Sequence, residues 1–183
     1  MGLGAMILTD REIQIALECS QIKIAPVPDV SAFSSTSVDL TLGDKAAVWQ
    51  AESGITLHPG RSGYSYGNIK KFQSLVNIQE IELKPQAFIL AWTREEVDLP
   101  QNSRIAARVE GKSSMARIGI GVHCTAPTIH AGFRGPIQLE IFNFGPHCIG
   151  LDPGMRICQL ILEQTFGTPS KGYAGMFLDQ KAS

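Results

Sequence analysis

The chain has 183 residues, of which 44% are hydrophobic and 18% are charged, and its formal net charge is −1. This composition is typical of a single globular domain with a buried core, and it excludes an intrinsically disordered chain. A net charge so close to zero gives no general attraction to nucleic acid or to an anionic membrane, and we expect neither as a partner. A polyanionic ligand must therefore be held by a local basic cluster.

The N-terminal segment and the cysteines indicate the compartment. Residues 1–5 read as a tag scar or a loose tail, and Asp10, Arg11 and Glu12 interrupt any signal-peptide pattern. No apolar run approaches the roughly 20 residues of a membrane span. The four cysteines form no C-x-x-C pair, so they give no zinc knuckle. We expect reduced thiols in a cytoplasmic protein.

In chain order, the first expected element is a short helix. Thr9 is a good N-cap and Glu12 follows three residues later, which is the pattern of a capping box. This helix should run to about Cys19. Next, the alternation of apolar and polar residues over 38–42 predicts a strand that ends at Gly43. Residues 51–71 are rich in glycine and poor in large apolar side chains, so they predict a long, exposed and mobile loop.

From residue 78 onward, short apolar segments recur between turn signals. They are 78–83, 88–93, 104–109, 119–124, 137–142, 148–151 and 157–163. Many short strands at this spacing predict a β-sandwich, a jelly roll or a small barrel. Only 114–118 reads as a helical turn. We expect one domain over residues 6–167, followed by a C-terminal tail, 168–183, that is loosely ordered unless it docks.

Two familiar motifs of nucleotide chemistry are missing. A zinc-dependent deaminase needs H-x-E and P-C-x-x-C elements, and the sequence has neither. Gly111 to Ser114 carry the closing letters of a phosphate-binding P-loop, but the first glycine of that motif is absent. We therefore expect no metal-ligating residues and no P-loop.

The stretch from Lys112 to Arg117 concentrates charge and hydroxyl groups. Lys112 and Arg117 are cations, and Ser113 and Ser114 lie between them. Such a group supplies charge-assisted hydrogen-bond donors, which suit a triphosphate. A solvated turn with a serine-rich cap fits the same spacing equally well.

Glu140 stands in the middle of an apolar strand. Alternation places its side chain on one face with Gln138 and Phe142, opposite a face of large apolar residues. A carboxylate there is costly unless it is paired or functional, and action as a general base is one such function. A surface-facing polar row shared with Gln138 explains the pattern equally well.

Several segments, taken together, resemble the dCTP deaminase family of the dUTPase superfamily. They are MILTDREI at 6–13, SVDLTLG at 37–43, GKSSMAR at 111–117, TA at 125–126, AGF at 131–133, LE at 139–140 and DPGMRI at 152–157. The resemblance covers nearly the whole chain, and the block 111–140 is its most specific part.

The resemblance implies a fold and an activity. The fold is mainly β, a distorted jelly-roll or β-barrel of the dUTPase type with a short N-terminal helix and few other helical turns. It implies a homotrimer with active sites at the subunit interfaces. The implied activity is hydrolytic deamination of dCTP to dUTP and ammonia without zinc, with Mg²⁺ carried by the triphosphate. dUTP and dTTP are further candidate ligands.

Carried over by position, the resemblance gives each candidate residue a role. Glu140 takes a proton from water, which then attacks C4 of the base. Ser113 and Arg117 hold the water and Glu140 in place. The remaining candidates bind substrate: Lys112 and Ser114 at the phosphates, Thr125 and Ala126 at the exocyclic group, Ile129 and His130 beside the sugar, and Lys171 and Tyr173 in the closing segment of the tail.

Three departures from the family keep the activity open. His130 stands where the family has Asp, which affects recognition of the sugar. Pro127 and Thr128 replace the pair that helps to separate deaminases from bifunctional enzymes. The tail has an inserted glycine, and Met176 stands in place of Gln. A dUTP diphosphatase or a bifunctional dCTP deaminase/dUTPase is therefore one alternative, and a nucleotide-binding homologue without turnover is another.

Overall fold

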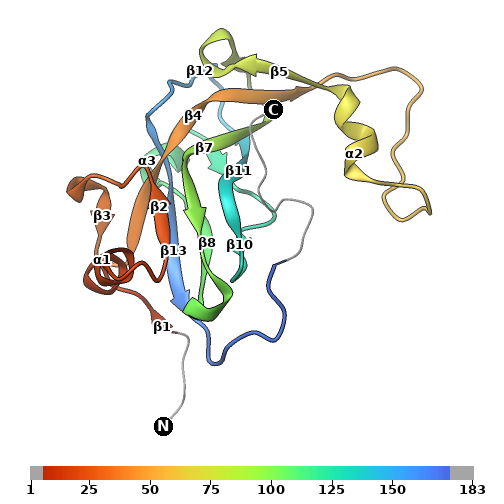
Figure 1. The fold of residues 1–183 in the computed structure, drawn as a ribbon. Helices are drawn as coiled ribbons and strands as arrows, with labels where there is room; N and C mark the ends of the chain where they lie inside the picture. The colour runs from red at the N-terminus through yellow and green to blue at the C-terminus, as the bar shows by residue number, and fades with distance from the viewer. Residues whose placement is uncertain (1–5, 174–183) are drawn as a thin grey trace.

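The computed structural model describes residues 6–173, and its architecture is mainly β (Figure 1). Its longest strand, β4 (Ser37–Trp49), belongs to both halves of one curled sheet. The first half of β4 pairs with β13 (Arg156–Gln164), and the second half pairs with β5 (Gln73–Asn77) and β7 (Phe88–Asp98). The expected mainly β architecture, with a short N-terminal helix and few other helical turns, is confirmed.

The remaining strands extend the two halves of this sheet. On one side, β13 also pairs with β8 (Ile105–Gly111) and β1 (Met6–Ile7), β8 pairs with β10 (Thr128–Ile129), and β3 (Phe33–Ser34) pairs with β4. On the other side, β7 pairs with β2 (Lys23–Ala25) and β11 (Arg134–Asn143), and β11 pairs with β9 (Ile120–Val122). A separate small ladder joins β6 (Glu82–Leu83) to β12 (Ile149–Gly150).

Helical structure is short, as the sequence predicts. Helix α1 (Asp10–Glu18) begins after Thr9, whose backbone N–H donates to the Glu12 carboxylate at 3.0 Å, so the expected capping box and helix are confirmed. Helix α3 (Ser113–Ala116) is the expected helical turn. The other turns are α2 (Tyr66–Ile69) and the 3₁₀ segments η1 (Val30–Ala32), η2 (Lys70–Phe72), η3 (Ile78–Glu80) and η4 (Gln101–Ser103).

The core lies inside the curl of the sheet. Strand β11 shows how it forms, because buried and half-buried side chains alternate along it. Ile137, Leu139 and Ile141 point inward and are at most 1% exposed. Burying each such side chain contributes about 1.5–3 kcal/mol, which fixes the register of β11. The opposite face of the strand is thereby directed away from the core.

The prediction that the first long strand ends at Gly43 was wrong. Strand β4 continues to Trp49, and its ladder with β7 shifts register between Leu42 and Ala46. A side chain at Gly43 would place its Cβ 3.0 Å from the carbonyl oxygen of Trp92, a tight contact that another residue could make only if the backbone shifted. The glycine therefore marks the bend where β4 passes from one half of the sheet to the other.

Two other expectations needed correction. Residues 51–71 are not loop throughout, because α2 lies within them, and β5 follows where no strand was expected. The predicted strand 78–83 is mostly the helical turn η3, and only Glu82–Leu83 is a strand. Strand β5 was missed because it is half-exposed and lacks a clear alternation, so its pairing with β4 rather than its own pattern makes it a strand.

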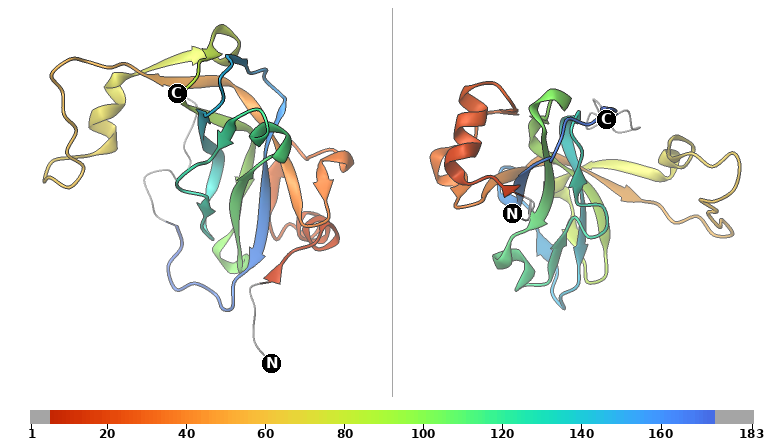
Figure 2. Two further views of the ribbon diagram at one scale, coloured as in Figure 1. Left: turned by 180° about the vertical axis from the view of Figure 1, so that it is seen from behind. Right: turned by 90° about the horizontal axis from the view of Figure 1, so that it is seen from below.

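Seen from two further directions, the segment between β4 and β5 projects away from the body of the molecule (Figure 2). The described part of the C-terminal tail, residues 168–173, lies against the body instead. The Tyr173 N–H donates to the Ala131 carbonyl at 3.2 Å, and Gln101 donates to the Pro169 carbonyl. We call residues 168–173 the strap. Within residues 6–173 no helix is long and apolar enough to cross a membrane.

Candidate active site

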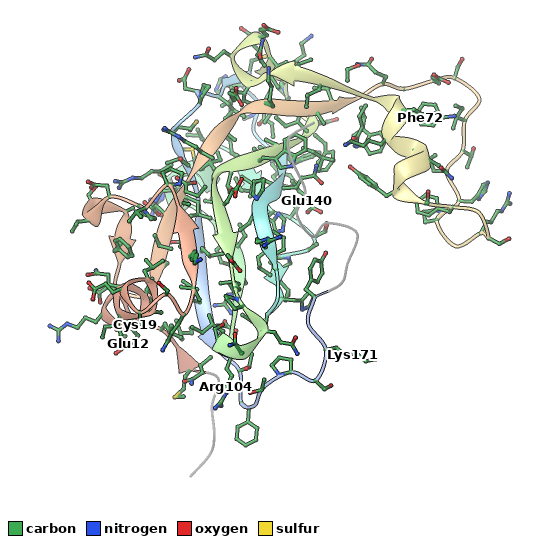
Figure 3. The ribbon with its side chains drawn as sticks, in the orientation of Figure 1. Glu12, Cys19, Phe72, Arg104, Glu140 and Lys171 are labelled. Atoms are coloured by element: carbon green, nitrogen blue, oxygen red, sulfur yellow. The ribbon has the colours of Figure 1, made fainter. Side chains whose placement is uncertain are left out.

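Strand β11 holds Glu140 on its outward face, half-buried, between inward-pointing Leu139 and Ile141. Figure 3 shows Glu140 on the side of β11 that faces the strap, where Lys171 lies. The face that carries Glu140 is therefore not an open polar row, since other elements cover part of it.

Thr125 fixes the Glu140 carboxylate. The Thr125 backbone N–H donates to Oε2 at 2.7 Å, and the Thr125 hydroxyl lies 2.7 Å from Oε1 and 2.8 Å from Oε2. A carboxylate offers about four lone-pair positions, so these bonds orient the group and leave acceptor positions for a further ligand. Hydrogen bonds to a charged acceptor are among the stronger ones in proteins.

The turn that carries Thr125 is itself pinned to β11. The His123 N–H donates to the Glu140 carbonyl at 2.6 Å, and the His123 ring Nε2 lies 2.6 Å from the Ala126 carbonyl. A carbonyl can only accept, so Nε2 carries a proton in this contact. His123 has a φ of 59°, an uncommon value for a residue other than glycine. The turn is therefore held from both ends.

The His123 side chain is half-buried, and this changes its acidity. Burial lowers the pKa of His123 below its usual 6.5, while the Ala126 carbonyl and the charge of Glu140 act in the opposite direction. Its Nδ1 atom is buried and has no hydrogen-bond partner among the described residues. A neutral ring satisfies this arrangement better than a charged one.

Glu140 and His123 line a cavity of about 300 Å³. The predicted substrate residues Ala126, Ile129, His130 and Tyr173 line the same cavity, and buried Ile129 and Phe133 give it an apolar side. The Tyr173 ring stacks on His130 with ring centres 5.8 Å apart and an angle of 19°. The structure thus brings the predicted catalytic carboxylate and most of the predicted nucleoside contacts together.

The segment that was predicted to bind phosphate lies on a different part of the surface from the Glu140 cavity. Lys112, Ser113 and Ser114 line a separate and more open cavity of about 650 Å³. The Lys112 ammonium donates to the Asp39 carboxylate at 2.6 Å, and Asp39 is only 6% exposed. Arg156 lies 3.7 Å from the second Asp39 oxygen. The Lys112 charge is therefore already partly compensated within the chain.

The two halves of the predicted site do not meet within one chain. Within residues 6–173, no hydrogen bond or ion pair joins Ser113 or Arg117 to Glu140. Arg117 is exposed at the C-cap of α3 and lines neither cavity. Lys171 is also exposed and lines neither.

Sequence reasoning missed three residues. Asp39 is a buried carboxylate within β4, His123 orients the Thr125 turn, and Gln138 lines the cavity beside Glu140. A charged residue inside the alternating 38–42 strand was a usable signal for Asp39. The sequence carried no such signal for His123, because its role depends on a left-handed backbone conformation that the sequence pattern does not predict.

The residues that could bind a metal are scattered. Among residues 6–173 no group of three or more His, Cys, Asp or Glu side chains converges as a metal site would. Of the thiols, Cys19, Cys124 and Cys148 are exposed, whereas Cys158 is fully buried and burial raises its pKa well above the ordinary value.

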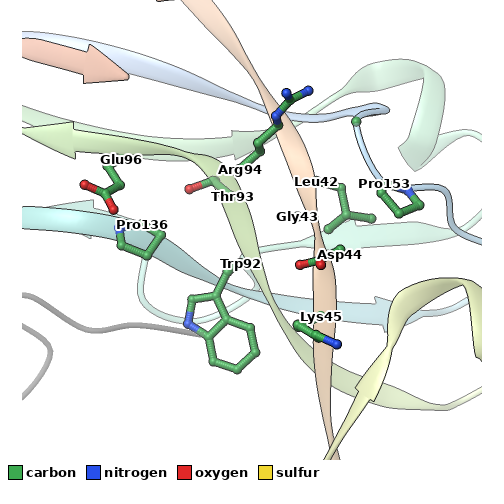
Figure 4. Close-up of a pocket in the computed structure, with 11 residues that line it drawn as sticks. Leu42, Gly43, Asp44, Lys45, Trp92, Thr93, Arg94, Glu96, Pro136 and Pro153 are labelled. Atoms are coloured by element: carbon green, nitrogen blue, oxygen red, sulfur yellow. The ribbon is translucent and has the colours of Figure 1, made fainter. Parts of the chain in front are cut away.

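A further cavity, of about 450 Å³, borders the same strands (Figure 4). Trp92, Arg94 and Glu96 from β7 line it together with Asp44 and Lys45 from β4. Its lining includes two acidic and two basic side chains, and none of the predicted site residues is among the residues that line it. It offers no carboxylate held as Glu140 is.

The chain is similar to several known proteins. Residues 7–165 match the family model described as dCTP deaminase-like. The chain is 36% identical over 178 residues to "dCTP deaminase, dUMP-forming" of Methanosphaera stadtmanae, covering 96% of this chain and 87% of that one. It is 39% identical over 174 residues to "dCTP deaminase" of Rhodospirillum rubrum, covering 92% of this chain and 88% of that one.

A solved structure shows the same fold. The crystal structure of 2′-deoxycytidine 5′-triphosphate deaminase from Agrobacterium tumefaciens superimposes with a TM-score of 0.65 and 25% sequence identity, covering 87% of this chain. The match covers 48% of that longer chain, so this chain spans about half the length of the solved protein.

Proposed function

The chain belongs to the dCTP deaminase-like family, and from this premise we propose that it hydrolyses dCTP to dUTP and ammonia. The observation that carries the proposal is the Glu140 carboxylate, oriented by Thr125 at the edge of a partly apolar cavity. A general base must be held within hydrogen-bond reach of its proton, and this arrangement provides an oriented acceptor with free lone pairs.

In the proposed reaction Glu140 takes a proton from water, and the resulting hydroxide attacks C4 of the cytosine ring. Glu140 then delivers protons towards N3 and the departing amine, so that ammonia leaves and a carbonyl forms at C4. One water is consumed for each ammonia released. The Ala126 carbonyl accepts one bond from His123 and has a second lone pair, which suits the exocyclic amino group of the base.

Ile129 and His130 are proposed to lie beside the sugar, and the strap with Lys171 and Tyr173 is proposed to close over the nucleotide. The stacking of Tyr173 on His130 supports the placement of the strap at the mouth of the cavity. The tail beyond Tyr173, including the Met176 departure, lies outside the described residues.

The phosphates are proposed to bind the segment from Lys112 to Arg117 of a neighbouring subunit in a homotrimer. The separation of this segment from Glu140 within one chain supports a shared site. Arg117 and Ser113 of one subunit would then complete the carboxylate site of the next. Ser114 and Lys112 would face the triphosphate.

A second candidate is a bifunctional enzyme that continues from dUTP to dUMP and pyrophosphate. The relatives from Methanosphaera stadtmanae and Aquifex aeolicus carry the name "dCTP deaminase, dUMP-forming", whereas the relative from Rhodospirillum rubrum is named "dCTP deaminase". The choice lies in whether a second water can be positioned at the α-phosphorus after C4 has reacted.

One assay separates these activities. The protein is incubated with dCTP and, separately, with dUTP, while ammonia, pyrophosphate and the nucleotides are followed individually. Ammonia in stoichiometric yield with dUTP supports the deaminase, and ammonia with pyrophosphate and dUMP supports the bifunctional enzyme. Binding of both nucleotides with no product at all would indicate a nucleotide-binding homologue without turnover.

We propose Mg²⁺ as an ion carried by the triphosphate and propose no zinc at the site. Charge-rich phosphates usually bring Mg²⁺ with them, and the reaction above uses a carboxylate rather than a metal to activate water. Removing Mg²⁺ should lower activity, and a zinc-selective chelator should leave it unchanged. Stoichiometric zinc lost together with activity would contradict this part of the proposal.

A further inference from the structure

A polar side chain in the Glu140 cavity has no partner in the described chain. Gln138 lines the cavity and is half-buried, and its side-chain amide makes no hydrogen bond within residues 6–173, although its backbone belongs to the ladder with β7. By contrast, Glu140 is bonded to Thr125, and His123 to the Ala126 carbonyl. A half-buried amide that points into a cavity without a partner is a candidate for ligand recognition.

The backbone holds Gln138 in this position. The ladder between β7 and β11 shifts register between Pro136 and Gln138, and the Thr93 side chain forms hydrogen bonds at this irregularity. The Ile137 N–H donates to the Thr93 hydroxyl at 2.9 Å, and this hydroxyl donates to the Glu95 carbonyl at 2.7 Å. A bulge of this kind changes the direction of the side chains that follow it. Gln138 is the first residue after the shift whose side chain lies on the cavity face.

The spacing of Gln138 and Glu140 matches the size of a nucleoside. Residues two apart on a strand share a face and lie about 7 Å apart along it. If C4 of a pyrimidine lies at Glu140, the sugar is attached at N1, on the opposite side of the ring. Gln138 is therefore placed at the sugar end of a nucleotide rather than at the reacting carbon.

We propose that the Gln138 amide reads the 3′-hydroxyl of the deoxyribose and so helps to determine substrate specificity. This rests on the proposed function, because Glu140 defines where the base lies. An amide can donate to a hydroxyl and accept from it, and being neutral it adds no repulsion towards the triphosphate. The neighbouring His130 ring already stacks on Tyr173 in the lining of the cavity, whereas the Gln138 amide has no such contact and can bind a ligand.

A double-mutant cycle between protein and ligand tests the assignment. Binding of dCTP and of 2′,3′-dideoxy-CTP is measured by calorimetry in a Glu140→Gln background with and without Gln138→Met, so that no substrate is consumed. Without Gln138→Met, loss of the 3′-hydroxyl should weaken binding about fivefold, the size of one neutral hydrogen bond. The Gln138→Met change should weaken binding of dCTP by a similar factor. It should weaken binding of the dideoxy nucleotide by less than about twofold.

Equal weakening of both nucleotides, or of neither, would overturn the assignment, because a merely structural role does not distinguish the two ligands. Gln138→Val provides the same cycle if the Met variant does not fold, which a thermal melt reveals. Turnover of dCTP by the unmutated chain is assayed separately. If turnover is absent but the cycle is non-additive, the proposed function fails and the role of Gln138 stands. Failure of both nucleotides to bind the background protein overturns both.

Discussion

The two cavities that carry the predicted residues differ in how far a single chain completes them. Around Glu140, the β-ladder between β7 and β11 positions the strand, and the Thr125 hydrogen bonds orient the carboxylate. A backbone hydrogen bond from Tyr173 holds the strap nearby. Around Lys112, the cavity is more open, the serines are exposed, and the Lys112 ammonium is bonded to Asp39. A single chain thus orients the carboxylate of the proposed catalytic half, whereas the proposed phosphate-binding segment lines a separate, more open cavity.

The largest expected effect concerns the proposed catalytic half. Glu140→Gln should lower deamination about 10²–10⁴-fold while dCTP still binds, because the amide has nearly the same shape but cannot take a proton from water. Ammonia release at saturating dCTP and calorimetric binding measure the two quantities. A variant that retained half of the unmutated rate would remove Glu140 from the mechanism.

Mixing variants tests whether the two halves come from different chains. Arg117→Ala and Glu140→Gln should each have little activity alone. Subunits mixed by unfolding and refolding together should regain about a quarter of full activity, since in a cyclic trimer a quarter of sites would combine the two intact residues. No recovery, in mixed trimers verified by mass, would place both residues in one chain. A light-scattering mass of a single chain would exclude the trimer itself.

In the part of the molecule around Lys112, the next prediction concerns the free energy of unfolding rather than the reaction rate. Asp39→Asn removes a buried carboxylate that holds Lys112 and lies near Arg156, so the free energy of unfolding should fall by about 1–3 kcal/mol. Chemical denaturation measures the change. Asp44→Asn, on the same strand but exposed, is the matched control and should shift stability by less than about 0.5 kcal/mol. Equal effects would mean that the Asp39 pairs contribute nothing.

The smallest effect is a pH dependence in the turn that holds Glu140. The pKa of His123 is lowered in the folded protein by burial, so below pH 6.5 the unfolded chain binds a proton that the folded chain resists. Stability should therefore fall as the pH drops through and below 6.5, and His123 adds no such dependence above it.

The His123→Asn variant isolates this contribution. Asn accepts the left-handed backbone conformation of this position better than most residues and does not titrate. Unfolding midpoints of the two proteins, measured between pH 5 and 8, should converge or cross towards acid pH. Parallel curves would show that His123 does not contribute to the acid sensitivity.

Most of the predicted strands and the first helix follow from local pattern, whereas β5 and the second half of β4 do not. Alternation identified the apolar face of β11 and, by exclusion, the outward direction of Glu140, because the side-chain period of a strand is fixed. Thr9 and Glu12 predicted where α1 begins for the same local reason. The resemblance of the 111–140 block then named the residues of both halves of the site.

Tertiary structure decided what lies across from these residues. No local signal shows that Thr125 reaches Glu140, that Lys112 is bonded to Asp39, or that β4 bends at Gly43 and continues. Each of these depends on contacts between separate segments of the chain: Thr125 and Glu140 are 15 positions apart in the sequence, and Asp39 and Lys112 are 73 positions apart. The sequence by itself determined which residues face outward, since that is a property of each strand. The division of the predicted site residues between two separate cavities depends on the curl of the sheet, because the curl sets which distant strands lie next to one another.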